Sequence, residues 1–361
     1  MTGADRRRMQ EPADAAAAAT RAAQPAVLIT GAGGEVGHGL MDALKDDAAT
    51  ALVGLDIREL PEEYAAMCAE TLRGDICDAT LLQPLHERYR ITHIYHLAAL
   101  LSSRAERDPE QAHRINVDGS MTLFRFAVEQ ARRYGEPVTF VYPSSIAVYG
   151  LPDLATKERA GAVGEPQFLD PVTMYGCNKL YVEHLGRYFS RHYRQIEMPP
   201  PPPPVDFRCV RYPGLISAHT VPSGGTSDYA PEMLHAAAQG EPYACFVRED
   251  ARIPFMTMPD AIEATLTLAH APRESLRHCV YNLGAFAPRA EGFAELVREF
   301  FPQARITFEP HPKRQAMVDS WPADVDTTAA RTEWGFAPKH DLHTAFAEYL
   351  VPAVKRRYGV A

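Results

Sequence analysis

Two short motifs in this chain carry residue types that together could oxidise an alcohol. In the first, Gly31, Gly34 and Gly37 follow one another at three-residue steps, directly after a short apolar run. Glycines at this spacing let the phosphates of a dinucleotide approach the free N–H groups at the start of a helix, where the helix dipole favours an anion. In the second, Tyr175 and Lys179 are four residues apart, so on a helix they share one face.

Tyr175 is the candidate base. A phenol has an ordinary pKa of about 10 and serves as a base at neutral pH only where that pKa is lowered. The ammonium of Lys179 and an oxidised nicotinamide both favour the phenolate. Ser144 and Ser145 follow an apolar run, and one of their hydroxyls could hold the substrate oxygen while Tyr175 takes its proton and a hydride leaves for the nicotinamide. Together the motifs predict a nicotinamide-dependent oxidoreductase or a close mechanistic relative.

Asp56 favours NAD over NADP as the cofactor. It ends a second apolar run, 19 residues beyond Gly37, where a carboxylate accepts hydrogen bonds from the adenosine ribose hydroxyls. A 2′-phosphate at that place would be repelled by the like charge. Arg58 leaves NADP open, because a nearby guanidinium can bind a phosphate, although a solvated arginine is the simpler interpretation.

A parallel sheet is needed to position these residues. Short apolar runs predict strands at residues 26–30 and 51–55. Further strand candidates are 72–74, 93–97, 138–142, 207–211 and 280–283, with helical patterns between them such as 115–134 and 175–193. Repeated strand, helix, strand units require right-handed crossovers and helices on both faces of the sheet. We therefore expect an α/β fold, a Rossmann-type doubly wound parallel sheet with a smaller, discontinuous C-terminal substrate lobe.

The expected domain organisation has three parts. Residues 1–24 form a flexible tail, and residues 25–212 plus 253–283 form the NAD-binding Rossmann domain. Residues 213–252 plus 284–361 are richer in proline, glycine and aromatic residues and less regular, so we expect them to form the substrate-binding lobe. The proline run 199–204 is expected to be an extended surface connector without a function of its own.

Composition narrows the class of protein. The 361 residues include 37 basic and 46 acidic side chains, a net charge of −9 that argues against nucleic acid or an anionic membrane as the main partner. The six cysteines form no C-x-x-C pair, so neither a metal site nor a disulfide framework is expected, and a reducing cytoplasm fits best. Acidic residues in the first 24 positions argue against an organelle transit sequence, and no stretch approaches the roughly 20 apolar residues of a membrane span.

Beyond these motifs, the chain resembles the extended short-chain dehydrogenase/reductase family. The resemblance is carried by the glycine turn, Asp56, Gly74-Asp75-Ile76, His96-Leu97-Ala98-Ala99, Asn116, the stretch from Ser144 to Gly150, and the Tyr175–Lys179 pair. It implies a catalytic group of Ser145, Tyr175 and Lys179, with Asn116 supporting the proton relay. It also implies NAD contacts from Asp75, Ile76, Leu97, Ala98, Ala99, Asn116, Tyr175, Lys179 and Tyr212.

Within that family, the second half of the chain resembles the short-chain L-threonine 3-dehydrogenases. The matching stretches are 100–102, 211–217, 224–230, 248–250, 258–261 and 319–322. The likeness implies NAD-dependent oxidation of the 3-hydroxyl of L-threonine to 2-amino-3-ketobutyrate, on a route toward glycine. The substrate would be held by Ser102, Ser145, Tyr175, Thr226, Asp228 and Trp321. The residues alone allow plainer roles: a loop serine at 102, a turn threonine at 226, a helix N-cap at 228 and a core aromatic at 321.

One segment departs from the family pattern. The gap between Ser145 and Tyr175 is several residues longer than usual, so we expect the loop at residues 155–166 to be an insertion near the pocket mouth. Whether it gates the site is open.

A homodimer is expected from the helical stretches 115–134 and 180–193, which carry more apolar and aromatic residues than solvated helices need. In the family the equivalent pair makes a four-helix dimer contact. Packing onto the sheet would also explain them.

Two other functions remain open at this stage. A nucleotide-sugar epimerase or dehydratase would use the same tyrosine, lysine and serine, hold its NAD tightly and give no net reduction. A cofactor-sensing regulator would keep the fold without the chemistry, but the intact Ser145, Tyr175 and Lys179 argue against it.

Overall fold

The computed structural model describes residues 23–47, 50–221 and 225–360. The predicted tail lies outside this part of the chain, except at its end, where the first strand already begins at Gln24. Among the described residues no helix is both long and apolar enough to cross a membrane.

A seven-stranded sheet has the order β11-β7-β5-β4-β1-β2-β3. Its strands are β1 (Gln24–Thr30), β2 (Ala51–Asp56), β3 (Glu70–Arg73), β4 (Tyr89–His96), β5 (Val138–Ser145), β7 (Val205–Tyr212) and β11 (Val280–Asn282). The pairs β1–β2, β1–β4, β2–β3 and β7–β11 are all parallel. Every residue of β2 and β7 is buried, as expected for strands covered on both faces. The predicted doubly wound α/β fold and all seven predicted strands are therefore confirmed.

The chain divides into two compact units, which we describe separately. Unit 1 comprises Met1–Ala98, Asp118–Phe140 and Gly186–Phe207, and unit 2 comprises Ala99–Val117, Val141–Leu185 and Arg208–Ala361. The domain boundaries predicted from the sequence differ from these units and stay a prediction.

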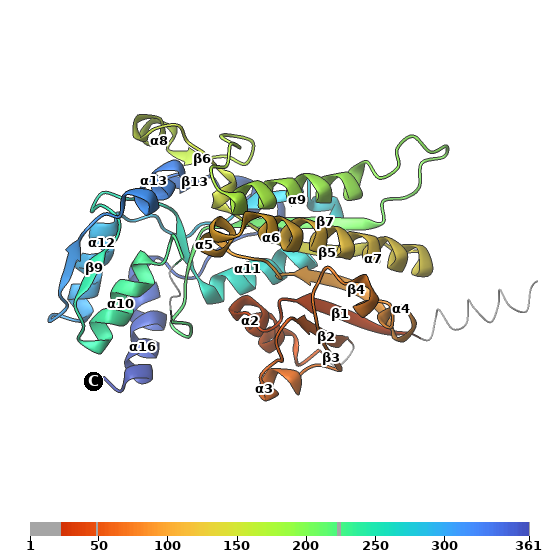
Figure 1. Ribbon diagram of the computed structural model, residues 1–361, viewed down its shortest axis with the longest axis horizontal. Coiled ribbons are helices and arrows are strands. Elements are labelled where there is room, and N and C mark those ends of the chain that lie inside the picture. Colours follow the sequence, from red (N-terminus) through yellow and green to blue (C-terminus); the bar gives the residue numbers. More distant parts are fainter. Residues whose placement is uncertain (1–22, 48–49, 222–224, 361) are drawn as a thin grey trace, which may run out of the picture. The chain divides into compact units, whose positions relative to one another are not determined.

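Unit 1 aligns the carboxyl ends of its central strands (Figure 1). Thr30, the last residue of β1, is paired with Leu55 in β2 and with His96 in β4. The segments that follow these three strands therefore leave the same edge of the sheet. The helices of this unit are α2 (Glu35–Leu44), α3 (Glu62–Ala65), α4 (Leu85–Arg88) and α7 (Gly119–Tyr134), with a 3-10 turn at Ala79–Leu81.

Unit 2 contains the part of α9 up to Leu185, which carries the predicted catalytic pair, and many shorter elements. Its helices are α5 (Ser102–Arg107), α6 (Pro109–His113), α8 (Leu154–Ala160), α9 (Met174–Arg191), α10 (Tyr229–Gln239), α11 (Met258–His270), α12 (Ala290–Phe300), α13 (Pro312–Ser320), α14 (Thr328–Trp334), α15 (Leu342–Thr344) and α16 (Val351–Tyr358). Two π-helical turns span Arg114–Asp118 and Ala345–Leu350, and 3-10 turns span Ile146–Val148 and Arg273–Ser275. Three parallel strand pairs join β8 (Gly214–Ile216) to β10 (Phe255–Thr257), β9 (Tyr243–Cys245) to β12 (Ile306–Phe308), and β6 (Ala162–Val163) to β13 (Asp324–Val325).

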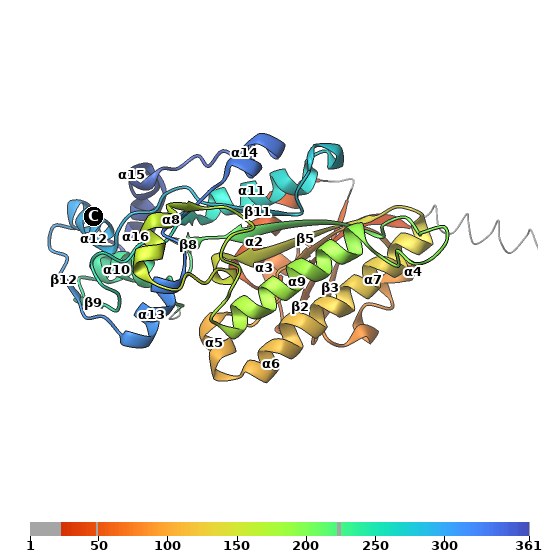
Figure 2. The same ribbon diagram turned by 90° about the horizontal axis from the view of Figure 1, so that it is seen from above.

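The C-terminal part of unit 2 is more regular than its composition predicts. Helices α10, α12 and α16 lie together in both views (Figures 1 and 2), and their apolar faces share one buried core.

The predicted loop at 155–166 is also partly wrong, because most of it is α8 and β6. Asp153 explains the helix, since its side chain accepts a hydrogen bond from the N–H of Thr156 at 2.6 Å and so caps the first turn.

Candidate active site

The glycine turn in unit 1 has no room for side chains. Gly31 has φ +70°, and a Cβ there would lie 2.6 Å from the backbone nitrogen of Ala98. A Cβ on Gly37 would lie 2.6 Å from the carbonyl oxygen of Ala32. Gly34 is the N-cap of α2, and no side chain caps that helix. A tight turn in front of an uncapped helix N-terminus is what a pyrophosphate requires.

Asp56 lies directly beside this turn. It is 7% exposed, and its two carboxylate oxygens accept hydrogen bonds from the N–H groups of Gly33 and Arg58, each at 2.9 Å. The Arg58 side chain is 75% exposed, with its Nε 3.8 Å from the carboxylate. A buried carboxylate thus stands at the end of β2, where the ribose of an adenosine is expected.

The other predicted NAD contacts of unit 1 follow neighbouring strands. The Asp75 carboxylate, after β3, accepts a hydrogen bond from the N–H of Cys77 at 3.0 Å, and Ile76 is 5% exposed. After β4, the N–H of Leu97 donates to the carbonyl of Thr30 at 3.0 Å, and the N–H of Ala98 donates to the Thr30 hydroxyl at 3.4 Å. These residues leave the sheet at the edge that carries the glycine turn. The free N–H groups at the start of α2, the close approach that the glycines allow and the buried Asp56 carboxylate fit NAD.

The predicted catalytic residues meet in unit 2. The Ser145 side chain lies within hydrogen-bonding reach of the Tyr175 phenol. The Lys179 Nζ lies 5.4 Å from the centre of the Tyr175 ring and 4.4 Å from that of Tyr142, and it donates to the carbonyl of Pro143 at 2.6 Å. One turn of α9 and the end of β5 therefore bring hydroxyl, phenol and ammonium into one group.

Burial opposes ionisation of both predicted catalytic residues, Tyr175 and Lys179. It raises the pKa of Tyr175 above its ordinary value, and the Ser145 hydrogen bond only partly offsets this. Burial also lowers the pKa of Lys179 to about 8, although the Glu183 carboxylate works against this shift. Without a cofactor, the protein therefore keeps Tyr175 protonated at neutral pH. Lys179 by itself does not sustain a phenolate.

Asn116 joins the same group through a residue that sequence reasoning did not single out. It lies in the π-helical turn Arg114–Asp118 and is 1% exposed. Its side-chain amide accepts from the N–H of Leu100 at 2.8 Å and donates to the side chain of Asn178 at 3.3 Å. Asn178 precedes Lys179 on α9, so the predicted relay residue reaches the catalytic helix by a direct hydrogen bond.

A buried ion pair behind the catalytic group was also missed. Glu183 and Arg211, 1% and 2% exposed, form two hydrogen bonds at 2.9 and 2.6 Å. Glu183 also accepts from the hydroxyl of Ser144 at 2.5 Å, and Arg211 donates to the phenol of Tyr149 at 2.8 Å. The pair ties α9 and β7 to the segment around Ser145. One sequence signal could have revealed Glu183. It follows Lys179 by four residues, as Lys179 follows Tyr175, so on a helix the three residues share one face.

The remaining predicted substrate residues occupy different places in unit 2. Ser102 begins α5, and Trp321 follows α13 directly and is 4% exposed. Thr226 is buried, with its hydroxyl 3.9 Å from the sulfur of Met317 on α13. Asp228 holds the N-cap position of α10, but its carboxylate accepts from the N–H of Gly225 at 2.6 Å instead of capping the helix. Thr226 and Trp321 are thus both connected to α13.

Two more predicted NAD contacts lie in unit 2. Ala99 follows Ala98 at the start of this unit. Tyr212 ends β7, and its buried phenol is hydrogen-bonded to the Thr265 hydroxyl. Burial raises the pKa of Tyr212 to about 12, so this phenol stays neutral.

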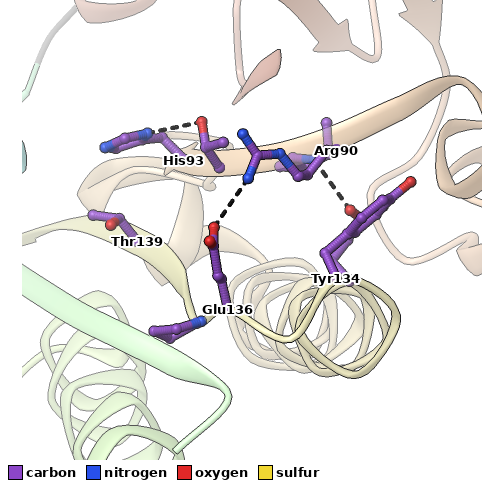
Figure 3. A pocket seen from close by; sticks show the side chains of 9 residues that line it. Arg90, His93, Tyr134, Glu136 and Thr139 are labelled. Atoms are coloured by element: carbon purple, nitrogen blue, oxygen red, sulfur yellow. Dashed lines mark hydrogen bonds and ion pairs between the residues drawn. The ribbon is translucent and has the colours of Figure 1, made fainter. Parts of the chain in front are cut away.

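Unit 1 also has a pocket at the amino ends of β4 and β5. Arg90, His93, Tyr134, Glu136 and Thr139 line it, and the Arg90–Glu136 ion pair at 3.0 Å crosses it (Figure 3). None of the predicted site residues is among its lining residues. Within the described residues, no cluster of histidine, cysteine, aspartate or glutamate could hold a metal ion.

Residues 27–284 match the NAD dependent epimerase/dehydratase family. The chain belongs to this family. Its cofactor is accordingly NAD, and the predicted membership of the extended short-chain dehydrogenases is confirmed.

Relatives in the family are similar over almost the whole chain. A mitochondrial L-threonine 3-dehydrogenase from Bos taurus is 34% identical over 90% of this chain and 80% of its own length. The holo structure of a GalE-like L-threonine dehydrogenase from Cupriavidus necator has a TM-score of 0.77 at 33% identity, covering 91% of this chain and 99% of that one. A monomeric L-threonine 3-dehydrogenase from a metagenome, also 33% identical, has the same TM-score and the same coverage.

Proposed function

We propose that this family member oxidises the 3-hydroxyl of L-threonine with NAD, giving 2-amino-3-ketobutyrate and NADH. The observation that carries the proposal is the group of Ser145, Tyr175 and Lys179 at the end of β5 and on α9. Similarity to L-threonine dehydrogenases over about nine-tenths of the chain supports threonine as the substrate. The product would be cleaved to glycine by a partner ligase or would lose carbon dioxide spontaneously.

In the proposed reaction Ser145, Tyr175 and Lys179 have different roles in the proton transfer. The Ser145 hydroxyl holds the substrate oxygen, and Tyr175 takes its proton. The glycine turn and Asp56 would hold NAD, which would supply the hydride acceptor and a positively charged ring that favours the phenolate. Lys179 supplies the second positive charge, and the partners of Asn116 and Glu183 keep α9 and the Ser145 segment in register.

L-threonine also needs partners for its charged ends. The carboxylate requires donors, which the hydroxyls of Ser102 and Thr226 and the indole N–H of Trp321 supply in this proposal. The ammonium requires an acceptor, and we assign this role to Asp228.

The deciding assay mixes purified protein with NAD and L-threonine and follows NADH. We expect steady NADH formation with NAD, and at least about tenfold lower kcat/KM with NADP, because Asp56 repels the 2′-phosphate. No NADH above the rate without threonine would refute the proposal.

A nucleotide-sugar epimerase or dehydratase is the second candidate, because the family model covers both activities. It would retain NAD through purification and interconvert a nucleotide sugar with no net reduction. A cofactor sensor would bind NAD without any turnover. The same assay, with a nucleotide-sugar arm and a measurement of bound NAD, separates the three functions.

We also propose that the protein is cytoplasmic and acts as a homodimer. The six cysteines are free thiols, which suits a reducing compartment. Tyr181 and Tyr188, seven residues apart on α9, are 51% and 42% exposed and support an apolar contact there.

A further inference from the structure

Lys157 lies on helix α8, in the segment predicted to be an insertion, and directs its ammonium into unit 2. The residue is buried, at 5% exposed, whereas the side chain of Lys339 is 66% exposed. The hydrogen bond between Asp153 and the N–H of Thr156 fixes the start of the helix. A lysine is rarely buried to this extent unless its ammonium has a defined partner.

The partner is a carbonyl at the end of α13. The Lys157 Nζ donates to the carbonyl oxygen of Val318 at 2.8 Å, and the backbone N–H of Trp321 donates to the same oxygen at 3.3 Å. Carbonyls in the last turn of a helix lack intrahelical donors and lie at the negative end of the dipole, so a cation is stabilising there. One atom thus receives both the inserted lysine and the backbone of Trp321.

Neighbouring contacts hold the same segment from other sides. The N–H of Leu151 donates to the carbonyl of Ser320 at 2.8 Å. Asp319 accepts from both terminal nitrogens of Arg248, at 2.8 and 3.0 Å. The residues on either side of the Val318 carbonyl are therefore fixed, and Lys157 completes the arrangement.

The Trp321 indole is left with a free donor. Its ring is buried, and its Nε1 has no hydrogen-bond partner among the described residues. A buried N–H without a partner costs free energy, which an acceptor on a ligand would recover. The orientation of this donor depends on the backbone that Lys157 helps to fix.

We propose that Lys157 is a positioning residue for the substrate: by holding the Val318 carbonyl it aims the Trp321 indole N–H at the carboxylate of L-threonine. This inference rests on the proposed function. It gives the inserted helix a role in substrate affinity and none in the chemical step.

The surrounding charges make the contact sensitive to pH. Burial lowers the pKa of Lys157 to about 8; the carboxylates of Asp319 and Asp250 raise it, and the guanidinium groups of Arg248 and Arg252 lower it further. The charged form is present below that pH, so the bond to Val318 is strongest there and weakens as the pH rises through 8.

The kinetic test compares Lys157→Met with Lys339→Met, which removes an exposed ammonium. We expect Lys157→Met to raise the KM for L-threonine about tenfold, with kcat and the KM for NAD changed less than about threefold. Lys339→Met should leave all three constants within about twofold of the wild type. An unchanged KM for L-threonine in Lys157→Met, or an equal rise in the KM for NAD, would overturn the inference.

A fluorescence test is independent of turnover. The chain has two tryptophans, so Trp334→Phe leaves Trp321 as the single emitter. In this background we expect the emission maximum to change with pH around 8, and Lys157→Met to abolish that change. Emission that does not respond to pH with Lys157 intact would overturn the inference. This measurement does not depend on whether Lys157→Met folds. If the wild type fails to reduce NAD with L-threonine, the proposed function fails on its own, and the inferred substrate role is refuted with it.

Discussion

The Tyr175 phenol and the Lys179 ammonium are buried where their charged forms are disfavoured. The pKa of the phenol is raised, and that of the lysine is lowered to about 8. Sites that need perturbed groups often keep them at the expense of stability. In the proposed mechanism Tyr175 therefore ionises only when a further positive charge is present, so the base would depend on bound NAD.

Removing the lysine charge should move the pH dependence of catalysis. Lys179→Met leaves the phenolate with one cation fewer, so the pKa of Tyr175 rises and the acid limb of kcat/KM should move at least about one pH unit toward higher pH. The profile is measured with saturating NAD, and Lys179→Arg is the control that keeps the charge. An acid limb at the wild-type position in Lys179→Met would show that this ammonium does not support the base.

The Asp56 carboxylate should set cofactor choice. In Asp56→Ala the adenosine ribose loses its acceptor and a 2′-phosphate no longer meets a negative charge, so we expect the KM for NAD to rise about tenfold and the preference for NAD over NADP to fall. Glu59→Gln, which removes a nearby carboxylate whose side chain is 86% exposed, is the matched control. Equal selectivity in Asp56→Ala and the wild type would remove the residue from this role.

At the scale of elements, the glycine turn joins two strand ends to a helix. Gly31→Ala should cost roughly 3 kcal/mol or more and weaken NAD binding, because the new Cβ has positive φ and meets the Ala98 backbone at 2.6 Å. Gly135→Ala is the control: its φ is +78° but nothing lies within 4 Å, so only about 1 kcal/mol is expected. Denaturant unfolding measures both variants. Equal losses would mean that the close approach at Gly31 does not matter.

The sequence predicted the elements that are continuous and apolar. Strand β2, which is buried throughout, gave a short apolar run in the sequence. Helix α8 did not, because its seven residues are mostly polar and only Lys157 is buried. The short strands β8 and β9 were missed because they pair with partners that are distant in the chain.

The candidate site was predictable to a similar extent. Tyr175, Lys179 and Ser145 were found because their chemistry depends on local spacing. The Glu183–Arg211 pair and the Lys157–Val318 contact join segments far apart in the chain, so only the fold brings them together. Trp321 was named by resemblance alone, and its unpartnered indole N–H became visible only with the coordinates.

At the scale of the whole molecule, the predicted homodimer is open to direct measurement. One solved relative is described as monomeric, so membership of the family does not decide the question. We expect a dimer in sedimentation equilibrium at micromolar concentration, and Tyr181→Glu with Tyr188→Glu to shift it to monomer. Ile196→Glu, at a residue that is 91% exposed and outside these helices, is the control. A wild-type monomer would contradict the prediction.

The most direct test of the account is the turnover of Tyr175→Phe with NAD and L-threonine. This variant keeps the ring and removes only the hydroxyl that takes the substrate proton. We predict that kcat falls about a thousandfold while the affinity for NAD, measured by calorimetry, stays within about threefold. A kcat within tenfold of the wild type would contradict the assignment of Tyr175 as the base, and with it the mechanism.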